Sequence, residues 1–154
     1  HLLPTGRFSG ELAVTEVDLL SRHVLEADEH TYSLFHCKMG SSRTTLFLAS
    51  MDILYNADKL SMEDIVRRQE LIGVMSLFNI TSQEADYPQE KQSKIDRVVF
   101  LARFHEYAKT VFIPAKKSGH VPQSWAEWSR IHSDFRPDIR HLLIDNSGKR
   151  KGGE

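Results

Sequence analysis

The chain has a single cysteine, Cys37, in the stretch FHCKMGSSRTT. His36 precedes it, Gly40 follows three residues later, and Arg43 and Thr44 follow six and seven residues later. The thiolate is the nucleophilic form of cysteine. A helix N-terminus and a neighbouring guanidinium both favour that form. We therefore expect a depressed pKa for the Cys37 thiol and a nucleophilic role for its sulfur.

The neighbours of the cysteine have the chemistry needed to bind a phosphate. Arg43 offers a planar fork that can bind two phosphate oxygens at once, and Gly40 allows a backbone conformation that other residues rarely adopt. Thr44 can donate a hydrogen bond to the sulfur as it leaves, and His36 can buttress the loop through its ring. We expect the residues between them to form a phosphate-binding loop, with Lys38 directed toward the substrate. The loop comprises Lys38, Met39, Gly40, Ser41 and Ser42.

A strand, a tight loop and a helix are predicted to position these residues. TYSLF (31–35) is a short β-prone run, residues 37–42 are turn-like, and RTTLFLASMDILY (43–55) has the pattern of a mostly buried helix. In this order the backbone N–H groups of the loop gather at the helix N-terminus. Such a loop forms a cradle for an anion.

Helices are also predicted on both sides of this unit. Thr15 should cap a helix that runs to about residue 29, and Ser61 with Asp64 should cap a second one that ends at Gly73. A long helix is expected over 91–112, between a loop (81–90) and a basic link (114–122), and a short one over 124–131. The residues expected to face the core are Val17, Leu20, Val24, Ile95, Val98, Val99, Ala102, Tyr107, Trp125 and Trp128.

The stretch around Cys37 resembles the signature of cysteine-dependent phosphatases, H-C-x2-G-x2-R-[S/T]. Together with MDIL (51–54), LSMEDIVRRQELIG (60–73) and SWAEW (124–128), it looks like the bacterial protein-tyrosine-phosphatase-like phytases, or inositol polyphosphatases. Met39 and Ser42 depart from the usual Ala and Gly of that family. The resemblance implies an α/β, three-layer fold, in which a central mixed sheet lies between helices and the loop lies at its carboxyl edge. It also implies a cysteinyl-phosphate intermediate and myo-inositol hexakisphosphate, or a related inositol polyphosphate, as substrate.

The general acid is the part of the mechanism that the sequence does not supply clearly. In the family that the chain resembles, an Asp in a T-D-H-x-x-P context protonates the leaving oxygen. His1 and Pro4 match the end of that motif, so the Asp and the N-terminal part of the domain are expected to be absent from this chain. Glu11 and Asp18 are weak substitutes, and Asp18 suits the first turn of a helix better.

Other polar residues can each be interpreted in two ways. Gln69 either orients the water that hydrolyses the intermediate or is an ordinary amide on a helix surface. Arg67 and Arg68 either contact a polyanion or are solvated, and weaker candidates for outer phosphates are Arg7, Lys91 and Lys94.

The composition excludes several classes of protein. The chain has 154 residues, a formal net charge of -1, 40% hydrophobic and 27% charged residues, which is typical of one soluble globular domain. We place a catalytic domain at 1–144 and a flexible tail at 145–154. A nucleic-acid binder would have a dense basic face, no apolar run is long enough to span a membrane, and the eight scattered His residues predict no metal site. We therefore expect neither a metal nor another cofactor.

Three functions remain open at this point. The first is the hydrolysis of inositol polyphosphates, and the second is a protein-tyrosine phosphatase of the bacterial effector type, with a phosphotyrosine protein as partner. The third is a catalytically incomplete module that binds phosphate without hydrolysing it. The sequence does not reveal the compartment, and secreted, periplasmic and host-translocated proteins all fit.

Overall fold

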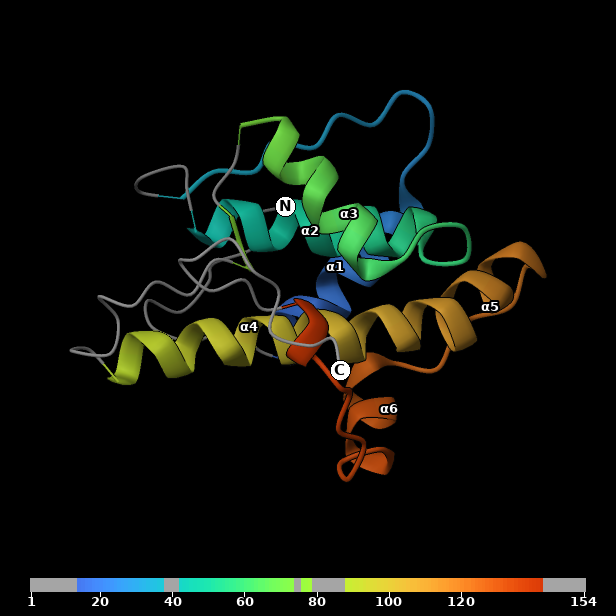
Figure 1. The fold of residues 1–154 in the computed structure, drawn as a ribbon. Coiled ribbons are helices and arrows are strands. Elements are labelled where there is room, and N and C mark those ends of the chain that lie inside the picture. The colour runs from blue at the N-terminus through green and yellow to red at the C-terminus, as the bar shows by residue number, and fades with distance from the viewer. Residues whose placement is uncertain (1–13, 38–41, 74–75, 79–87, 143–154) are drawn as a thin grey trace.

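The computed structural model describes residues 14–37, 42–73, 76–78 and 88–142, and these residues form helices joined by loops (Figure 1). The helices are α1 (Val14–Glu26), α2 (Ser42–Asn56), α3 (Met62–Leu71), α4 (Pro88–Tyr107), α5 (Ile113–Lys117) and α6 (Trp125–Ile131). A π-helical turn, η2 (Ala108–Phe112), joins α4 to α5, and a 3-10 turn, η3 (Arg140–Leu142), follows α6.

The predicted α/β fold with a central mixed sheet is wrong, because the described residues contain no β-strand. The β-prone run at 31–35 is extended, but no second strand lies beside it within the described part of the chain. A strand is stabilised by hydrogen bonds to a neighbouring strand. Local β-propensity therefore did not suffice to make a sheet here.

The core lies between α2 and the helices that pack around it. α2 contacts α1, α3 and α4, and Figure 1 shows α2 and α3 on one side of the long rod formed by α4 and α5, while α1 overlaps α4 in this view. The predicted stripe of α1 is confirmed, since Val17, Leu20 and Val24 are fully buried. Thr15 lies inside α1 and does not precede it, because the helix begins at Val14.

The predicted limits of α3 are confirmed. The Ser61 hydroxyl accepts a hydrogen bond from the Asp64 N–H at 3.1 Å, which satisfies one of the donors at the helix N-terminus. Gly73 has a φ of 95°, a left-handed conformation that favours glycine at a helix end. α2 and α3 are joined by the short segment 57–61 and pack against each other.

The long helix extends beyond both of its predicted ends. It begins at Pro88, inside the expected loop, and continues through η2 to Lys117, inside the expected basic link. Pro114 has no N–H to donate, and the Ile113 N–H instead bonds the Ala108 carbonyl. A π-helical turn of this kind lets the helix pass the proline without stopping.

The buried face of α4 differs in part from the predicted stripe. Val98 and Tyr107 are buried as expected, whereas Ile95, Val99 and Ala102 are only half-buried. The side chains that the prediction missed are Phe100, Leu101 and Phe104, which are 0–2% exposed.

The two tryptophans of α6 are core anchors, as predicted. Trp125 and Trp128 are buried, and their rings stack with centroids 5.4 Å apart. Trp125 also contacts the rings of Phe104 and Tyr107. Among the described residues, no helix is long and apolar enough to cross a membrane. The predicted tail at 145–154 lies outside the described residues.

Candidate functional site

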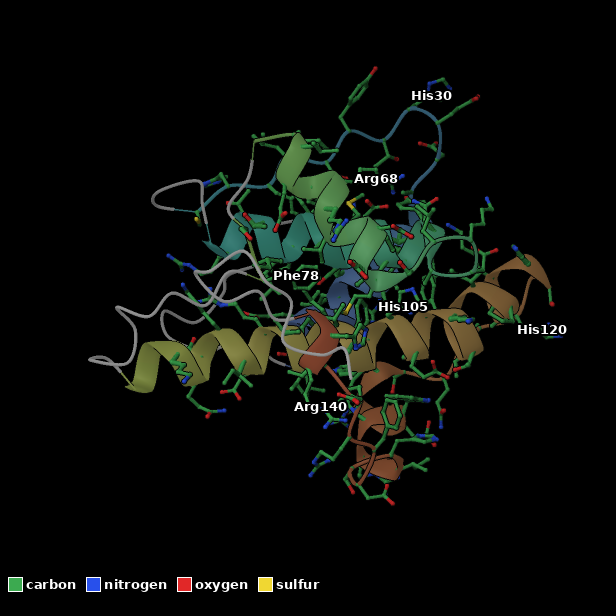
Figure 2. The ribbon with its side chains drawn as sticks, in the orientation of Figure 1. His30, Arg68, Phe78, His105, His120 and Arg140 are labelled. Atoms are coloured by element: carbon green, nitrogen blue, oxygen red, sulfur yellow. The ribbon has the colours of Figure 1, made fainter. Side chains whose placement is uncertain are left out.

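An extended segment leads from α1 to Cys37. It follows a turn in which the Asp28 carboxylate accepts hydrogen bonds from the Thr31 hydroxyl and the His30 N–H, at 2.7 and 3.0 Å. These hydrogen bonds lower the pKa of Asp28. His30 lies at the outer tip of this turn (Figure 2). Residues 32–36 make no backbone–backbone hydrogen bond to any residue that the structure describes, and the contacts described for them are made by side chains.

Two side chains attach this segment to the helices. The Ser33 hydroxyl lies 2.6 Å from Nε2 of His23 on α1. The Phe35 ring stacks on the ring of Phe47 on α2, with centroids 6.0 Å apart and planes at 23°. Phe47 is buried in the core. The segment that ends at Cys37 is thus packed against the same helix that begins immediately after the loop.

Cys37 and the first turn of α2 bracket the predicted loop. Cys37 is half-buried, His36 before it is exposed, and Arg43 is half-buried in the first turn of α2. The four loop residues Lys38, Met39, Gly40 and Ser41 lie outside the described residues, and Ser42 is the first residue of α2. The positive end of a helix of 15 residues therefore begins five residues after the thiol.

Thr44 has a hydroxyl that the fold does not use. Its side chain is buried, and its Oγ1 finds no hydrogen-bond partner among the residues that the structure describes. Leaving a buried hydroxyl unpaired costs about 1–3 kcal/mol, so such a group in a native protein calls for an explanation. A group bound at the helix N-terminus, or the sulfur itself, would supply that partner.

Gln69 lies at the centre of a different cluster. It is 7% exposed, so it is not a surface amide, and its Nε2 donates to Oδ2 of Asp52 at 2.9 Å. Asp52 is ten residues beyond Ser42, which corresponds to about 15 Å along the axis of α2. The structure therefore places Gln69 beside Asp52 and away from the start of α2.

The arginines of α3 are both paired with carboxylates. Arg67 binds Glu63 at 2.8 Å, and Arg68 binds both carboxylate oxygens of Asp52; Figure 2 shows Arg68 on α3. Lys91 is exposed and Lys94 half-buried near the start of α4. Arg7 lies outside the described residues, and of the predicted basic residues that are described, Arg67 and Arg68 are already engaged by carboxylates.

Asp18 has a structural partner. Its Oδ1 accepts a hydrogen bond from the Trp125 N–H at 2.8 Å, so it caps the N-terminus of α6 from α1. Glu11, the other substitute for a general acid, lies outside the described residues. In the described ranges, no group of three His, Cys, Asp or Glu side chains could hold a metal ion.

Two contacts between residues distant in sequence were missed by the sequence analysis. The Phe35–Phe47 contact joins residues 12 positions apart, and the Asp52 cluster joins residues 16 and 17 positions apart. One signal for the second was present, because Asp52 is an acid inside the apolar run LFLASMDILY and a charge on a buried helix needs a partner.

Comparison with known proteins identifies relatives in plant-associated bacterial genera. No family model matches the chain. The uncharacterized protein AvrBs1.1 of Xanthomonas campestris pv. campestris is 36% identical over 94 residues, which are 60% of this chain and 83% of that protein. AvrBs1.1 of Xanthomonas euvesicatoria gives the same values. The effector protein hopD2 of Pseudomonas syringae pv. tomato is 30% identical over 128 residues, which are 83% of this chain but only 24% of hopD2. The chain belongs to the same protein family as AvrBs1.1 of Xanthomonas.

Proposed function

We propose that this protein is a cysteine-dependent phosphatase that hydrolyses phosphoric monoesters in two steps. The Cys37 thiolate attacks phosphorus, and the bond between phosphorus and the leaving oxygen breaks while that oxygen takes up a proton. Water then attacks the cysteinyl-phosphate and releases inorganic phosphate and the thiolate. Arg43 and the N–H groups at the start of α2 stabilise the charge on the phosphoryl oxygens in both steps.

The observation that carries this proposal is the unpaired hydroxyl of Thr44. It is buried in the first turn of α2, next to Arg43 and seven residues after the only cysteine. A hydrogen bond from this hydroxyl to the sulfur would stabilise the thiolate as the leaving group of the second step. The unpaired hydroxyl therefore supports a site that binds and releases a charged group at this helix end.

A phosphotyrosine protein is the substrate that the described residues favour. Arg67 and Arg68 are bound to Glu63 and Asp52, so their charge is already compensated and they are poor contacts for a polyphosphate. The similarity to a protein named an effector supports the effector type of phosphatase, and with it secretion from the bacterium and entry into a host cell.

Inositol polyphosphates are the second candidate substrate. The stretches MDIL and RRQELIG are those on which the chain resembles the phytase-like enzymes. Phosphate release from a phosphotyrosine peptide and from inositol hexakisphosphate, each measured with the wild type and Cys37→Ser, separates the two. Phosphate release from the peptide alone supports a phosphotyrosine protein as substrate, and release from inositol hexakisphosphate alone overturns that assignment.

A binding module is the third candidate, because the one proposed acid that the structure describes, Asp18, has a structural partner on another helix. Asp18 caps α6, and Glu11 is not among the described residues. Isothermal titration that detects tight binding of a phosphorylated ligand, with no hydrolysis by the wild type, would favour binding over catalysis.

A further inference from the structure

We propose that the stacked rings of Phe35 and Phe47 form a clamp that holds the Cys37 thiol at the same position along the axis of α2 as the Arg43 guanidinium. This proposal rests on the function proposed above and makes Phe35 a positioning residue for it. The clamp is the contact between the Phe35 and Phe47 rings.

Few contacts to the described residues attach the segment 32–36 to the rest of the fold. Within the described part of the chain, residues 32–36 make no backbone–backbone hydrogen bond, and Tyr32 and Leu34 are 96% and 89% exposed. The Ser33–His23 contact attaches the segment to α1, which does not carry Arg43. Phe35 is therefore the side chain between the Asp28 turn and Cys37 that attaches the segment to α2.

The span from Phe35 to Cys37 matches the span from Phe47 to Arg43 in length. Phe35 and Cys37 are two residues apart on extended chain, which corresponds to about 6.6 Å. Phe47 and Arg43 are four residues apart on a helix, which corresponds to about 6 Å, and residues with this spacing share one face of the helix. Both spans, from Phe35 to Cys37 and from Phe47 to Arg43, run from the clamp toward the loop. Stacking of the two rings therefore aligns the Cys37 thiol with the Arg43 guanidinium.

One ring of the clamp, that of Phe47, is fixed in the hydrophobic core. Phe47 is 6% exposed and belongs to the hydrophobic core, so it provides a fixed surface. Phe35 is half-buried and packs against that core from the segment. Since a displacement of about 1 Å at a reacting group can reduce a rate about 100-fold, loosening Phe35 should impair the chemistry more than it impairs the fold.

The test measures the thiol directly, without turnover. Because Cys37 is the only cysteine, the rate of its alkylation by iodoacetamide at different pH values reports the pKa of this group alone. The variants are Phe35→Ala, which removes the clamp, and Phe35→Leu and Phe47→Leu, which keep apolar volume. The matched control is Phe135→Ala, because Phe135 is also half-buried against the core and contacts one ring, that of Trp128. Circular dichroism checks that each variant is folded.

The expected result is a thiolate midpoint in the wild type well below the ordinary value of about 8.5, and a midpoint near that ordinary value in Phe35→Ala. A shift of about two pH units lowers the thiolate fraction at pH 6.5 by roughly 50-fold. The midpoint of the pH profile is the readout rather than the rate, because a thiolate of higher pKa is also more nucleophilic. Phe135→Ala should keep the wild-type midpoint, and kcat for an aryl phosphate should fall in the Phe35 variants with little change in KM.

Two negative outcomes are distinguishable. A depressed midpoint that is the same in the wild type, Phe35→Ala and Phe35→Leu overturns the clamp and leaves the proposed phosphatase standing. An ordinary midpoint in the wild type itself overturns both. If Phe35→Ala does not fold, the two leucine variants decide, since they keep most of the buried volume and lose only the ring contact.

Discussion

The carboxylate of Asp52 joins α2 to α3, and we predict that Asp52→Ala costs about 2–4 kcal/mol of unfolding free energy. Asp52 accepts hydrogen bonds from Gln69 at 2.9 Å, from Nε of Arg68 at 3.0 Å and from Asn56 at 2.7 Å. Without it, the amide of Gln69, which is 7% exposed, is left buried without this acceptor, at a cost of about 1–3 kcal/mol. Arg68 is 44% exposed and can return to water, so its share is smaller, about 0.5–1 kcal/mol.

Urea and thermal unfolding followed by circular dichroism measure this cost. For a chain of this size about 1 kcal/mol corresponds to a shift of about 2–4 °C, so the midpoint of thermal unfolding should fall by roughly 4–16 °C. The matched control is Glu63→Ala, which breaks the neighbouring ion pair with Arg67 on the surface of α3. The side chains of this i,i+4 pair are 48% and 24% exposed, and a helix pair of this spacing contributes about 0.3–0.5 kcal/mol. Equal losses in the two variants would refute the reasoning that burial of the Gln69 amide decides the magnitude.

Three further predictions test other parts of the structure. Asp18→Ala should cost about 1 kcal/mol, measured by tryptophan fluorescence during unfolding, because Asp18 caps α6 at the Trp125 N–H; unchanged stability would contradict this role. Thr44→Val should leave the free energy of unfolding unchanged or slightly higher, because it removes a buried hydroxyl that has no partner in the described residues, yet it should slow phosphate release after a rapid first turnover. Burial raises the pKa of Tyr107 above its ordinary value of 10.0, so the unfolded chain ionises first and stability falls as the pH rises past about 10. Tyr107→Phe removes the hydrogen bond to the Gln123 carbonyl, so its free energy of unfolding at pH 7 should be about 1 kcal/mol lower than that of the wild type. Unfolding measured from about pH 7 to 11 should show that the variant lacks the decrease in stability that ionisation of Tyr107 causes in the wild type.

Several features set by local sequence were predicted correctly, although the predicted Thr15 cap was not, because α1 begins at Val14. The apolar spacing of α1, the Ser61 cap of α3 and the two tryptophans of α6 all lie as expected. Each depends on residues within about one or two helical turns, and helix periodicity and capping are local properties.

Features that depend on distant partners were not predicted. The β-prone run at 31–35 has no neighbouring strand in the described residues, and propensity does not reveal whether one is present. In α4 the run VVFLARF is buried on more than one side, so the sequence did not define a single stripe. The helix passes Pro114 because a π-helical turn removes the conflict, which a rule for prolines does not anticipate.

The candidate site divides in the same way. The spacing of Cys37, Arg43 and Thr44 is contained in eight consecutive residues and could be interpreted directly. The contacts of Phe35 with Phe47 and of Gln69 with Asp52 join residues that are separated along the chain and meet only in the fold.

The most direct test of the central claim is to trap the covalent intermediate. Wild-type protein and Thr44→Val are mixed with a phosphotyrosine peptide, quenched rapidly, digested and sequenced by mass spectrometry. We predict a phosphoryl group on the sulfur of Cys37, in a larger amount in Thr44→Val, and no labelled peptide from Cys37→Ser. Phosphate release by the wild type without any phosphorylated Cys37, or undiminished release by Cys37→Ser, would contradict the mechanism.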